Sequence, residues 1–172
     1  MVETKQTLWL TGRPCAGKTT IADRLIDEME KRGIRVARLD GDDVRGRLNA
    51  DLGFSEEDRR ENLRRVAHVA QLFNENGNLV IAAFVSPTNE LRSLVRGIVQ
   101  NFKLCYVKCA PEVCEARDVK GMYKKARAGQ IKDFTGVTAP FEEPLRPEIV
   151  VDTVKQDLEA CVGHILKELH RR

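Results

Sequence analysis

Residues 11–20, TGRPCAGKTT, combine residue types and a spacing that suit the binding of phosphate groups. Gly12, Gly17, Lys18 and Thr19 match the pattern G-x-x-x-x-G-K-[ST]. In such a loop the glycines let backbone N–H groups converge on phosphate oxygens, the lysine reaches the β- and γ-phosphates, and the hydroxyl meets Mg²⁺. The segment therefore predicts a site for the phosphates of a nucleotide, with Lys18 in the chemistry and Thr19 as a metal ligand.

The sequence on either side of this loop has the order that a phosphate site requires. The apolar run TLWL at 7–10 precedes the loop and is typical of a buried strand. Residues 21–33 follow it, with apolar side chains at helical spacing and a glycine at the end. Because strand, loop and helix come in this order, we favour a phosphate site over a glycine-rich turn without a ligand.

A second group of candidate side chains lies in LDGDDVRGRLN, residues 39–49. Asp40 and Asp42 follow a predicted strand, and Gly41 between them allows a sharp turn. Both carboxylates could then face one site, Asp40 toward Mg²⁺ and Asp42 toward the hydroxyl of a phosphate acceptor. An aspartate-rich turn without a catalytic role is the alternative.

Alternating strand and helix patterns supply the scaffold for these residues. The continuous apolar run at 79–85 suits a strand covered on both faces. We expect one α/β domain over 1–172, of P-loop NTPase type, with a five-stranded parallel sheet, helices on both faces and ligands at the carboxyl ends of the strands. Periodicity predicts strands over 7–10, 35–40, 79–85, 103–109 and 148–152. It predicts helices over 18–32, 56–76, 88–101, 111–129 in two pieces broken near Gly121, and 153–170.

Composition excludes several other classes of protein. The 29 Lys and Arg against 26 Asp and Glu give a net charge of only +3, which does not favour a nucleic-acid partner. The N-terminus lacks the apolar core of a signal peptide, and no apolar run approaches the roughly 20 residues that span a bilayer. The five cysteines form no C-x-x-C pair and no zinc pattern, so we expect free thiols in a reducing compartment. A cytoplasmic protein without a membrane partner is the prediction.

A phosphate loop followed by two carboxylates would suit any small P-loop kinase, and three further stretches of sequence indicate which family of kinases this chain resembles. They are LDGDDVRGRLNADLGFSEEDRRENLRRVAHVAQLF at 39–73, FVSP at 84–87 and RDVKGMYKKARAGQIKDFTGVTAPFEEP at 117–144. Together with GRPCAGKTT, and in this order, they closely resemble the adenosine 5′-phosphosulfate (APS) kinase family over essentially the whole chain. The resemblance implies transfer of the ATP γ-phosphate to the 3′-hydroxyl of APS, with Mg²⁺ as cofactor, in a homodimer.

The resemblance also implies roles for individual residues. In that family the acceptor lies between two aromatic rings, which match Phe54 and Phe134, and its phosphosulfate and ribose are held by residues that match Arg45, Arg59 and Asn62. Flat rings suit an adenine face, and guanidinium groups suit a phosphosulfate. The residues expected to bind ATP are Gly12, Arg13, Pro14, Cys15, Ala16, Gly17, Lys18, Thr19, Thr20 and Arg117, the last at the adenine.

The basic segment at 117–147, with its long glycine- and proline-containing loop at 130–147, is expected to form a lid over the phosphates. Its cations Lys120 and Lys132 are expected to contact the substrate. A nucleic-acid patch is the alternative, but Tyr123 is the only aromatic residue in the basic cluster. We therefore favour the lid.

Ser86 occupies the family position once credited with a phosphoenzyme intermediate. A serine without an adjacent histidine is a poor nucleophile, and direct transfer needs only positioning and charge stabilisation, so we expect Ser86 to hydrogen-bond the acceptor. The sequence departs from the common family pattern in RPCA of the loop, in DDV for DNV, and in SPTNELR for the SPYR-type segment after the serine. The last departure lies beside the acceptor and leaves its identity open.

Two other functions remain at this stage. A related kinase with another nucleotide-like acceptor would use the same loop and carboxylates. A regulatory GTPase or a nucleotide-dependent binding module is the alternative of a different class, and DVRG at 43–46 matches the loose D-x-x-G pattern. The guanine-binding N-K-x-D pattern is missing from the sequence, which favours the kinase.

Overall fold

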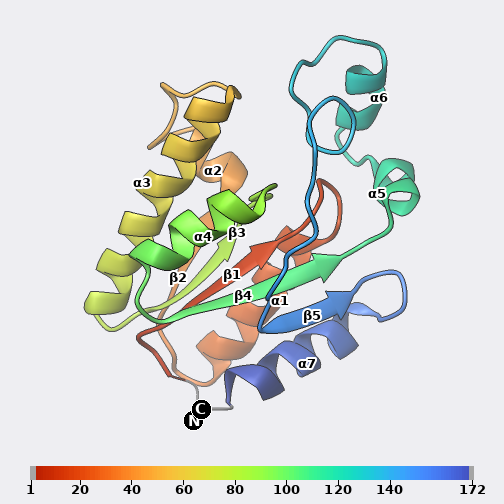
Figure 1. The fold of residues 1–172 in the computed structure, drawn as a ribbon. Coiled ribbons are helices and arrows are strands. Elements are labelled where there is room, and N and C mark those ends of the chain that lie inside the picture. The colour runs from red at the N-terminus through yellow and green to blue at the C-terminus, as the bar shows by residue number, and fades with distance from the viewer. Residues whose placement is uncertain (1–2, 171–172) are drawn as a thin grey trace.

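The computed structural model describes residues 3–170, which form one α/β unit (Figure 1). Its five strands are all parallel and lie in the order β2-β3-β1-β4-β5. The strands are β1 (Thr7–Thr11), β2 (Val36–Asp40), β3 (Leu79–Ala83), β4 (Phe102–Lys108) and β5 (Ile149–Asp152). The helices are α1 (Lys18–Lys31), α2 (Gly41–Arg45), α3 (Glu56–Glu75), α4 (Asn89–Ile98), α5 (Pro111–Arg117), α6 (Met122–Arg127) and α7 (Leu158–Leu169). The expected fold class is confirmed.

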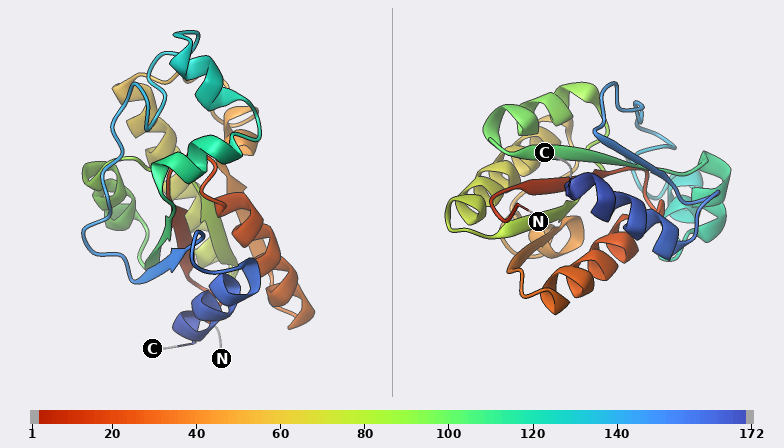
Figure 2. Two further views of the ribbon diagram at one scale, coloured as in Figure 1. Left: turned by 90° about the vertical axis from the view of Figure 1, so that its right-hand side faces the viewer. Right: turned by 90° about the horizontal axis from the view of Figure 1, so that it is seen from below.

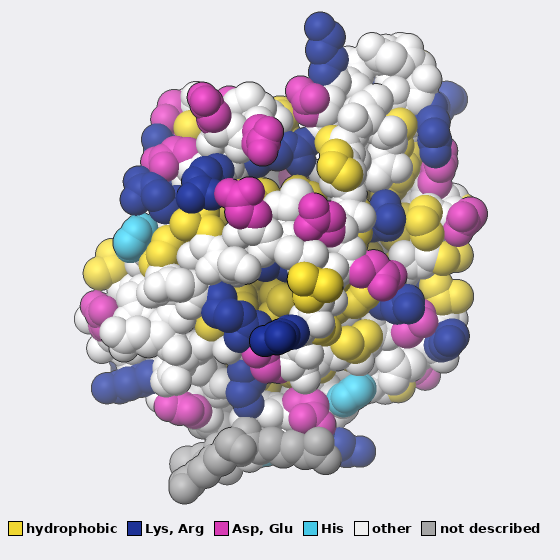
Figure 3. All heavy atoms as spheres, in the orientation of Figure 1, with side chains coloured by type: hydrophobic (Ala, Val, Ile, Leu, Met, Phe, Trp, Pro, Cys, Tyr) yellow, Lys and Arg dark blue, Asp and Glu magenta, His cyan; other side chains and the backbone are white. Residues whose placement is uncertain are grey.

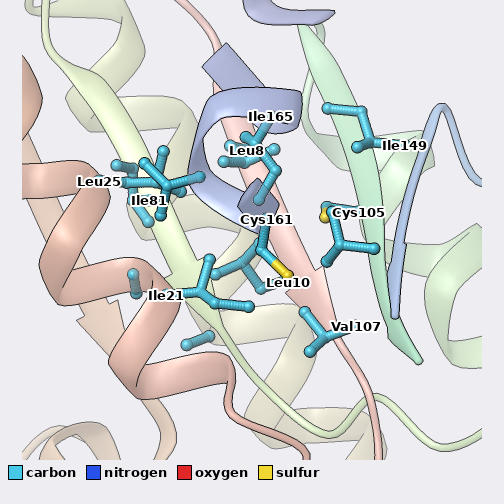
Figure 4. Packing of buried hydrophobic residues seen from close by; sticks show 14 of the residues in the cluster. Leu8, Leu10, Ile21, Leu25, Ile81, Cys105, Val107, Ile149, Cys161 and Ile165 are labelled. Atoms are coloured by element: carbon cyan, nitrogen blue, oxygen red, sulfur yellow. The ribbon is translucent and has the colours of Figure 1, made fainter. Parts of the chain in front are cut away.

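The alternation of side chains along the strands divides the core into two layers. Leu8 and Leu10 of β1 pack with α1 and α7 on one face of the sheet, as the close view in Figure 4 shows. Trp9 between them points to the other face, where α3 and α4 cover it. The view from below in Figure 2 shows α1 and α7 on one side of the sheet and α3 and α4 on the other.

The outer surface carries both signs of charge. On the face in Figure 3, lysine and arginine side chains are interspersed with aspartate and glutamate side chains. All five cysteines are free thiols, as expected. In residues 3–170, no helix combines the length and the apolar character that crossing a membrane requires.

Most boundaries lie within one or two residues of the predicted ones, and three elements differ by more. The helix α7 begins at Leu158 rather than at 153, because Asp157 caps its N-terminus through the N–H of Ala160. The helix α4 ends at Ile98 rather than at 101, because Val99 takes an extended conformation. The helix α2 was expected to be a sharp turn at Gly41 and is instead one helical turn capped by Asp40.

Candidate active site

The phosphate-binding loop connects β1 to α1 as expected. Gly12 lies so close to β4 that a Cβ would approach the Val107 carbonyl oxygen to 2.6 Å, so no other residue fits there. Gly17 has a φ of +105° and precedes the first helical residue. The Lys18 ammonium donates to the carbonyls of Gly12 and Arg13 at 2.9 Å each, and desolvation lowers its pKa to about 8. The lysine thus rests against the loop that it is expected to leave when phosphates bind.

Thr19 and Asp40 are joined by a direct hydrogen bond in the site. The Thr19 hydroxyl donates to Oδ2 of Asp40 at 2.9 Å, and Oδ1 of Asp40 accepts from the Asp42 backbone N–H at 3.1 Å. Asp40 is only 7% exposed at the end of β2. Hydroxyl and carboxylate oxygens are donors that Mg²⁺ prefers, so the pair fits this ion.

Protein groups alone do not form a closed metal cage here. No cluster of three His, Cys, Asp or Glu side chains suited to a metal occurs in residues 3–170. Mg²⁺ typically binds through one or two protein ligands together with substrate phosphates and water. The donor set therefore suits a nucleotide-bound Mg²⁺.

The carboxylates of Asp40 and Asp42 diverge. The Asp40 side chain caps α2 and is buried, whereas the Asp42 side chain on the first turn of α2 is 75% exposed. The Asp42 carboxylate forms an ion pair with Lys120, which follows α5, and this contact raises the pKa of Lys120. Both aspartates line one cavity.

That cavity has a volume of about 1230 Å³ and joins the phosphate loop to the segments expected to hold the acceptor. Gly12 and Ala16 are buried behind the loop and do not line it, and the Arg13 guanidinium packs over the Phe141 ring at 5.0 Å instead. The expected site residues that line the cavity are Pro14, Cys15, Gly17, Lys18, Thr19, Thr20, Asp40, Asp42, Arg45, Phe54, Arg59, Asn62, Ser86, Arg117, Lys120, Lys132 and Phe134.

The two aromatic residues lie in different segments that Arg59 connects. The Arg59 Nε donates to the Phe54 carbonyl at 2.9 Å, and its Nη1 donates to the Thr135 hydroxyl at 2.8 Å. A third bond runs from its Nη2 to the Asp133 carbonyl. One guanidinium therefore binds the backbone of Phe54 and both neighbours of Phe134, through the Asp133 carbonyl and the Thr135 side chain.

The two rings differ in their packing. Phe54 is 58% exposed, and the Arg45 guanidinium lies 4.3 Å from its centroid. Phe134 is half-buried and meets the Tyr123 ring edge-on at 5.0 Å. Burial lowers the pKa of both Arg45 and Arg59, so the cavity holds two desolvated cations beside an exposed ring.

Asn62 is oriented by a residue that sequence reasoning missed. Its Oδ1 accepts from Nδ2 of Asn49 at 2.9 Å, and both side chains are buried. With its oxygen engaged, Asn62 has its amide N–H groups left for a ligand. Asn49 carries no sequence signal for this role because the contact joins the loop after α2 to α3.

Ser86 follows β3 and is 2% exposed. The Trp9 indole N–H donates to its hydroxyl at 2.8 Å, and Ser86 has a φ of +43°. Within residues 3–170, its hydroxyl has no hydrogen bond to a histidine or a carboxylate. This environment gives the hydroxyl no base that would make it a nucleophile.

Arg117 lines the same cavity and is held by Thr153. Its Nη1 donates to the Thr153 hydroxyl at 3.1 Å, and its Nη2 donates to the Thr153 carbonyl at 3.0 Å. The Thr153 hydroxyl in turn donates to the Ala16 carbonyl at 2.9 Å. Thr153, Gln156, Asp157 and Leu158 also line the cavity, and they were missed because a helix was predicted to begin at 153.

A parallel α/β sheet with a phosphate loop after its first strand, facing a second set of cations and aromatic rings across one cavity, defines a P-loop kinase. Residues 4–152 match the family model described as "Adenylylsulphate kinase". The chain therefore belongs to the adenylyl-sulfate kinase (APS kinase) family and is an ATP-using enzyme with that activity. Membership in this family removes the regulatory GTPase and the binding module from consideration.

Individual relatives agree with this assignment. A probable adenylyl-sulfate kinase of Bacillus subtilis is 49% identical over 162 residues, covering 93% of this chain and 82% of its own. An adenylyl-sulfate kinase of Bacillus licheniformis is 51% identical over 162 residues, with the same coverage of 93% and 82%. The solved APS kinase of Mycobacterium tuberculosis in complex with AMPPNP and APS is similar with a TM-score of 0.93 and 35% identity, covering 98% of this chain and 99% of its own.

Proposed function

We propose that this chain binds ATP at the phosphate loop and transfers its γ-phosphate to the 3′-hydroxyl of adenosine 5′-phosphosulfate. The observation that carries the proposal is the single cavity that joins Lys18 and Thr19 to Arg45, Arg59 and Phe54. Its two ends suit two nucleotides with their phosphates between them. The similar M. tuberculosis enzyme was solved with an ATP analogue and APS, which supports this pair of substrates.

The phosphate side holds ATP through the loop. The backbone N–H groups of residues 13–20 surround the phosphates, Lys18 moves from the Gly12 and Arg13 carbonyls to the β- and γ-phosphates, and Arg117 contacts the adenine. Thr19 and Asp40 hold Mg²⁺, which neutralises charge on the phosphates when it is bound. Lys120 and Lys132 add positive charge from the lid segment at 117–147.

The acceptor side positions APS for direct transfer. Phe54 and Phe134 stack on its adenine, and Arg45 and Arg59 neutralise its phosphosulfate. The Asn62 amide donates to the acceptor, and the Ser86 hydroxyl holds it close to the reacting end.

Asp42 is the base in this scheme. It accepts the proton of the 3′-hydroxyl, and the hydroxyl oxygen then forms its bond to the γ-phosphorus as the bond to the ADP oxygen breaks. Direct transfer needs no covalent intermediate on Ser86. The pairing of substrates in one cavity supplies the proximity that such a reaction requires.

The oligomeric state of the protein and its location in the cell are two further parts of the proposal. We propose a homodimer, on the basis of the family resemblance, and a cytoplasmic location, because free thiols suit a reducing compartment. Light scattering of the purified protein would measure the oligomeric state.

The function is tested by the product. Phosphorus NMR of a reaction with ATP and APS should show the new phosphate on the 3′-oxygen of the acceptor. AMP, which lacks the sulfate, should be a poor acceptor because Arg45 and Arg59 lose part of their ligand. A preference for AMP over APS would favour a kinase with another nucleotide-like acceptor.

A further inference from the structure

The segment SPTNELR at 86–92, which departs from the common family pattern, ends in an arginine that the scheme above does not use. Arg92 lies on α4 and is only 3% exposed. A buried guanidinium is retained only where its donors are satisfied, so its partners indicate what it holds in place.

The partners of Arg92 come from two segments that are far apart in the sequence. Its Nε donates to the Ser86 carbonyl at 2.9 Å, and its Nη2 donates to the Pro87 carbonyl at 3.2 Å. The same Nη2 contacts the carbonyl of Glu142, fifty residues further on. The guanidinium therefore bridges the loop after β3 and the strap, by which we mean residues 141–145 at the end of the lid segment.

The backbone of Ser86 needs such support. Its φ of +43° lies in the left-handed region, which a residue other than glycine adopts only when its surroundings enforce it. The Ser86 carbonyl accepts from Arg92 and, at 3.3 Å, from the Thr11 hydroxyl. The serine hydroxyl is oriented separately, by Trp9. Arg92 is thus the charged group that holds the Ser86 carbonyl.

The strap is fastened to the same place by further contacts. The Glu142 N–H donates to the Pro87 carbonyl at 2.8 Å, and the Asn89 N–H donates to Oε2 of Glu142 at 2.7 Å. The Phe141 ring has the Arg92 guanidinium at 5.3 Å and the Arg13 guanidinium of the phosphate loop at 5.0 Å. The strap therefore contacts both the acceptor serine segment and the phosphate loop.

We propose that Arg92 is a positioning residue that fixes Ser86 in its left-handed conformation and fastens the strap to it. One buried guanidinium would then determine the geometry of the acceptor side of the active site. The inference rests on the proposed function only where Ser86 is taken to contact APS. Arg92 touches no reacting atom, and its effect on turnover passes through Ser86 and the strap.

Trp9 provides a reporter that does not depend on turnover. It is the only tryptophan in the sequence, it is fully buried, and its indole N–H bonds to Ser86. Loss of that bond in Ser86→Ala gives the reference change in tryptophan emission. Arg92→Lys keeps the charge without the fork, and Arg92→Met keeps the length without the charge. Arg60→Met is the matched control, because Arg60 is exposed and pairs with Glu90 on the same helix as Arg92.

Both Arg92 variants should shift the Trp9 emission in the direction of Ser86→Ala. They should raise the KM for APS at least about tenfold, since misplacement of about 1 Å can cost a hundredfold, while the Kd for ATP stays unchanged. Arg60→Met should do neither. Far-UV circular dichroism establishes which variants are folded. If neither Arg92 variant folds, Asn89→Ala decides, since Asn89 accepts from Arg92 Nη1 at 2.7 Å and should give a smaller change of the same kind.

Unchanged emission and unchanged acceptor KM in a folded Arg92 variant, or in Asn89→Ala when neither folds, would overturn the inference. An equal loss of ATP and APS affinity would also overturn it, because that pattern indicates general damage to the fold. Failure of the proposed function is separate: it would appear as a wild-type protein that does not use APS, whereas the emission test reads the link between Arg92 and Ser86 directly.

Discussion

Lys120 and Asp42 both line the active-site cavity and form an ion pair there, although they are 78 positions apart in the sequence. Both side chains are largely exposed, at 65% and 75%, so water screens the pair and it contributes little to stability. A cation of the proposed lid segment thus pairs with the proposed base. We expect the acceptor hydroxyl and the phosphates to take over these two partners when the substrates bind.

The substitution Asp42→Asn tests whether Asp42 is the base of the reaction. The substitution keeps the shape of the side chain but removes the charge and the ability to accept the hydroxyl proton, so kcat should fall by about a hundredfold or more while the Kd for ATP changes little. Asp43→Asn is the control, since Asp43 pairs with Arg38 and its side chain is 61% exposed. A surviving kcat with weakened ATP binding would make Asp42 a nucleotide or metal ligand and pass the role of base to Asp40.

The lowered pKa of Lys18 predicts that the protein takes up a proton when ATP binds. Its pKa is lowered from 10.5 to about 8 in the protein, so at about pH 8.5 it is largely neutral, and polyphosphate beside it should raise the pKa again. Calorimetry in two buffers of different ionisation enthalpy should detect this uptake. Lys18→Ala should abolish it and lower turnover by at least about a hundredfold. Near-normal turnover in this variant would contradict the role of the loop.

The lowered pKa of Lys18 also predicts how its contribution to stability depends on pH. Because its folded pKa lies below the unfolded value, the unfolded chain binds more protons between about pH 8 and 10.5, so the contribution of Lys18 to the free energy of unfolding rises with pH across that window. The difference in unfolding midpoint between the wild type and Lys18→Met, measured by urea titration, should therefore move in favour of the wild type from pH 8 to pH 10. A difference independent of pH would contradict the lowered pKa.

Ser86→Ala distinguishes direct transfer from a phosphoenzyme. If the hydroxyl only positions the acceptor, the variant should keep measurable turnover with a raised KM for APS. Rapid mixing with labelled ATP, followed by acid quench and peptide mapping, should find no phosphoserine at position 86. A phosphoserine that forms and decays as fast as turnover would establish the covalent route.

Phe54→Ala and Phe134→Ala test the aromatic pair. Stacking on a base is worth about 1–3 kcal/mol per ring, which predicts a loss of APS affinity of roughly 5- to 150-fold in each variant, with ATP affinity nearly unchanged. Phe54→Ala should cost little stability because the ring is 58% exposed. Phe73→Ala on α3 is the control, since this residue is 39% exposed and does not line the cavity. A large stability loss without an acceptor-selective defect in either variant would refute the sandwich.

Local patterns were sufficient to predict most of the scaffold. The sequence patterns gave all five strands. The central strands β1 and β3 are covered on both faces and are buried along their whole length, whereas the edge strands β2 and β5 each include an exposed residue. The loop motif placed Lys18 and Thr19, since strand, glycine loop and helix are contiguous in sequence. The last helix was predicted five residues too early, because Thr153 bonds to Ala16 rather than joining α7.

The contacts that orient the side chains of the site could not be predicted from local sequence patterns. Trp9 reaches Ser86 across 77 positions, and Arg92 reaches Glu142 across 50. Such pairs leave no periodic signal, because only the order of the strands brings their segments together. Tertiary packing likewise directs Arg13 to Phe141 rather than into the cavity. Residue type and spacing could therefore predict what chemistry is present, and the fold was needed to find what positions it.

The release of ADP from ATP, measured in a coupled assay with and without APS, tests the proposed reaction most directly. With Mg²⁺ present, the wild-type protein should release ADP rapidly only when APS is added, at one ADP for each APS consumed. ADP release that is fast without APS, or that APS leaves unchanged, would contradict the transfer of phosphate to this acceptor.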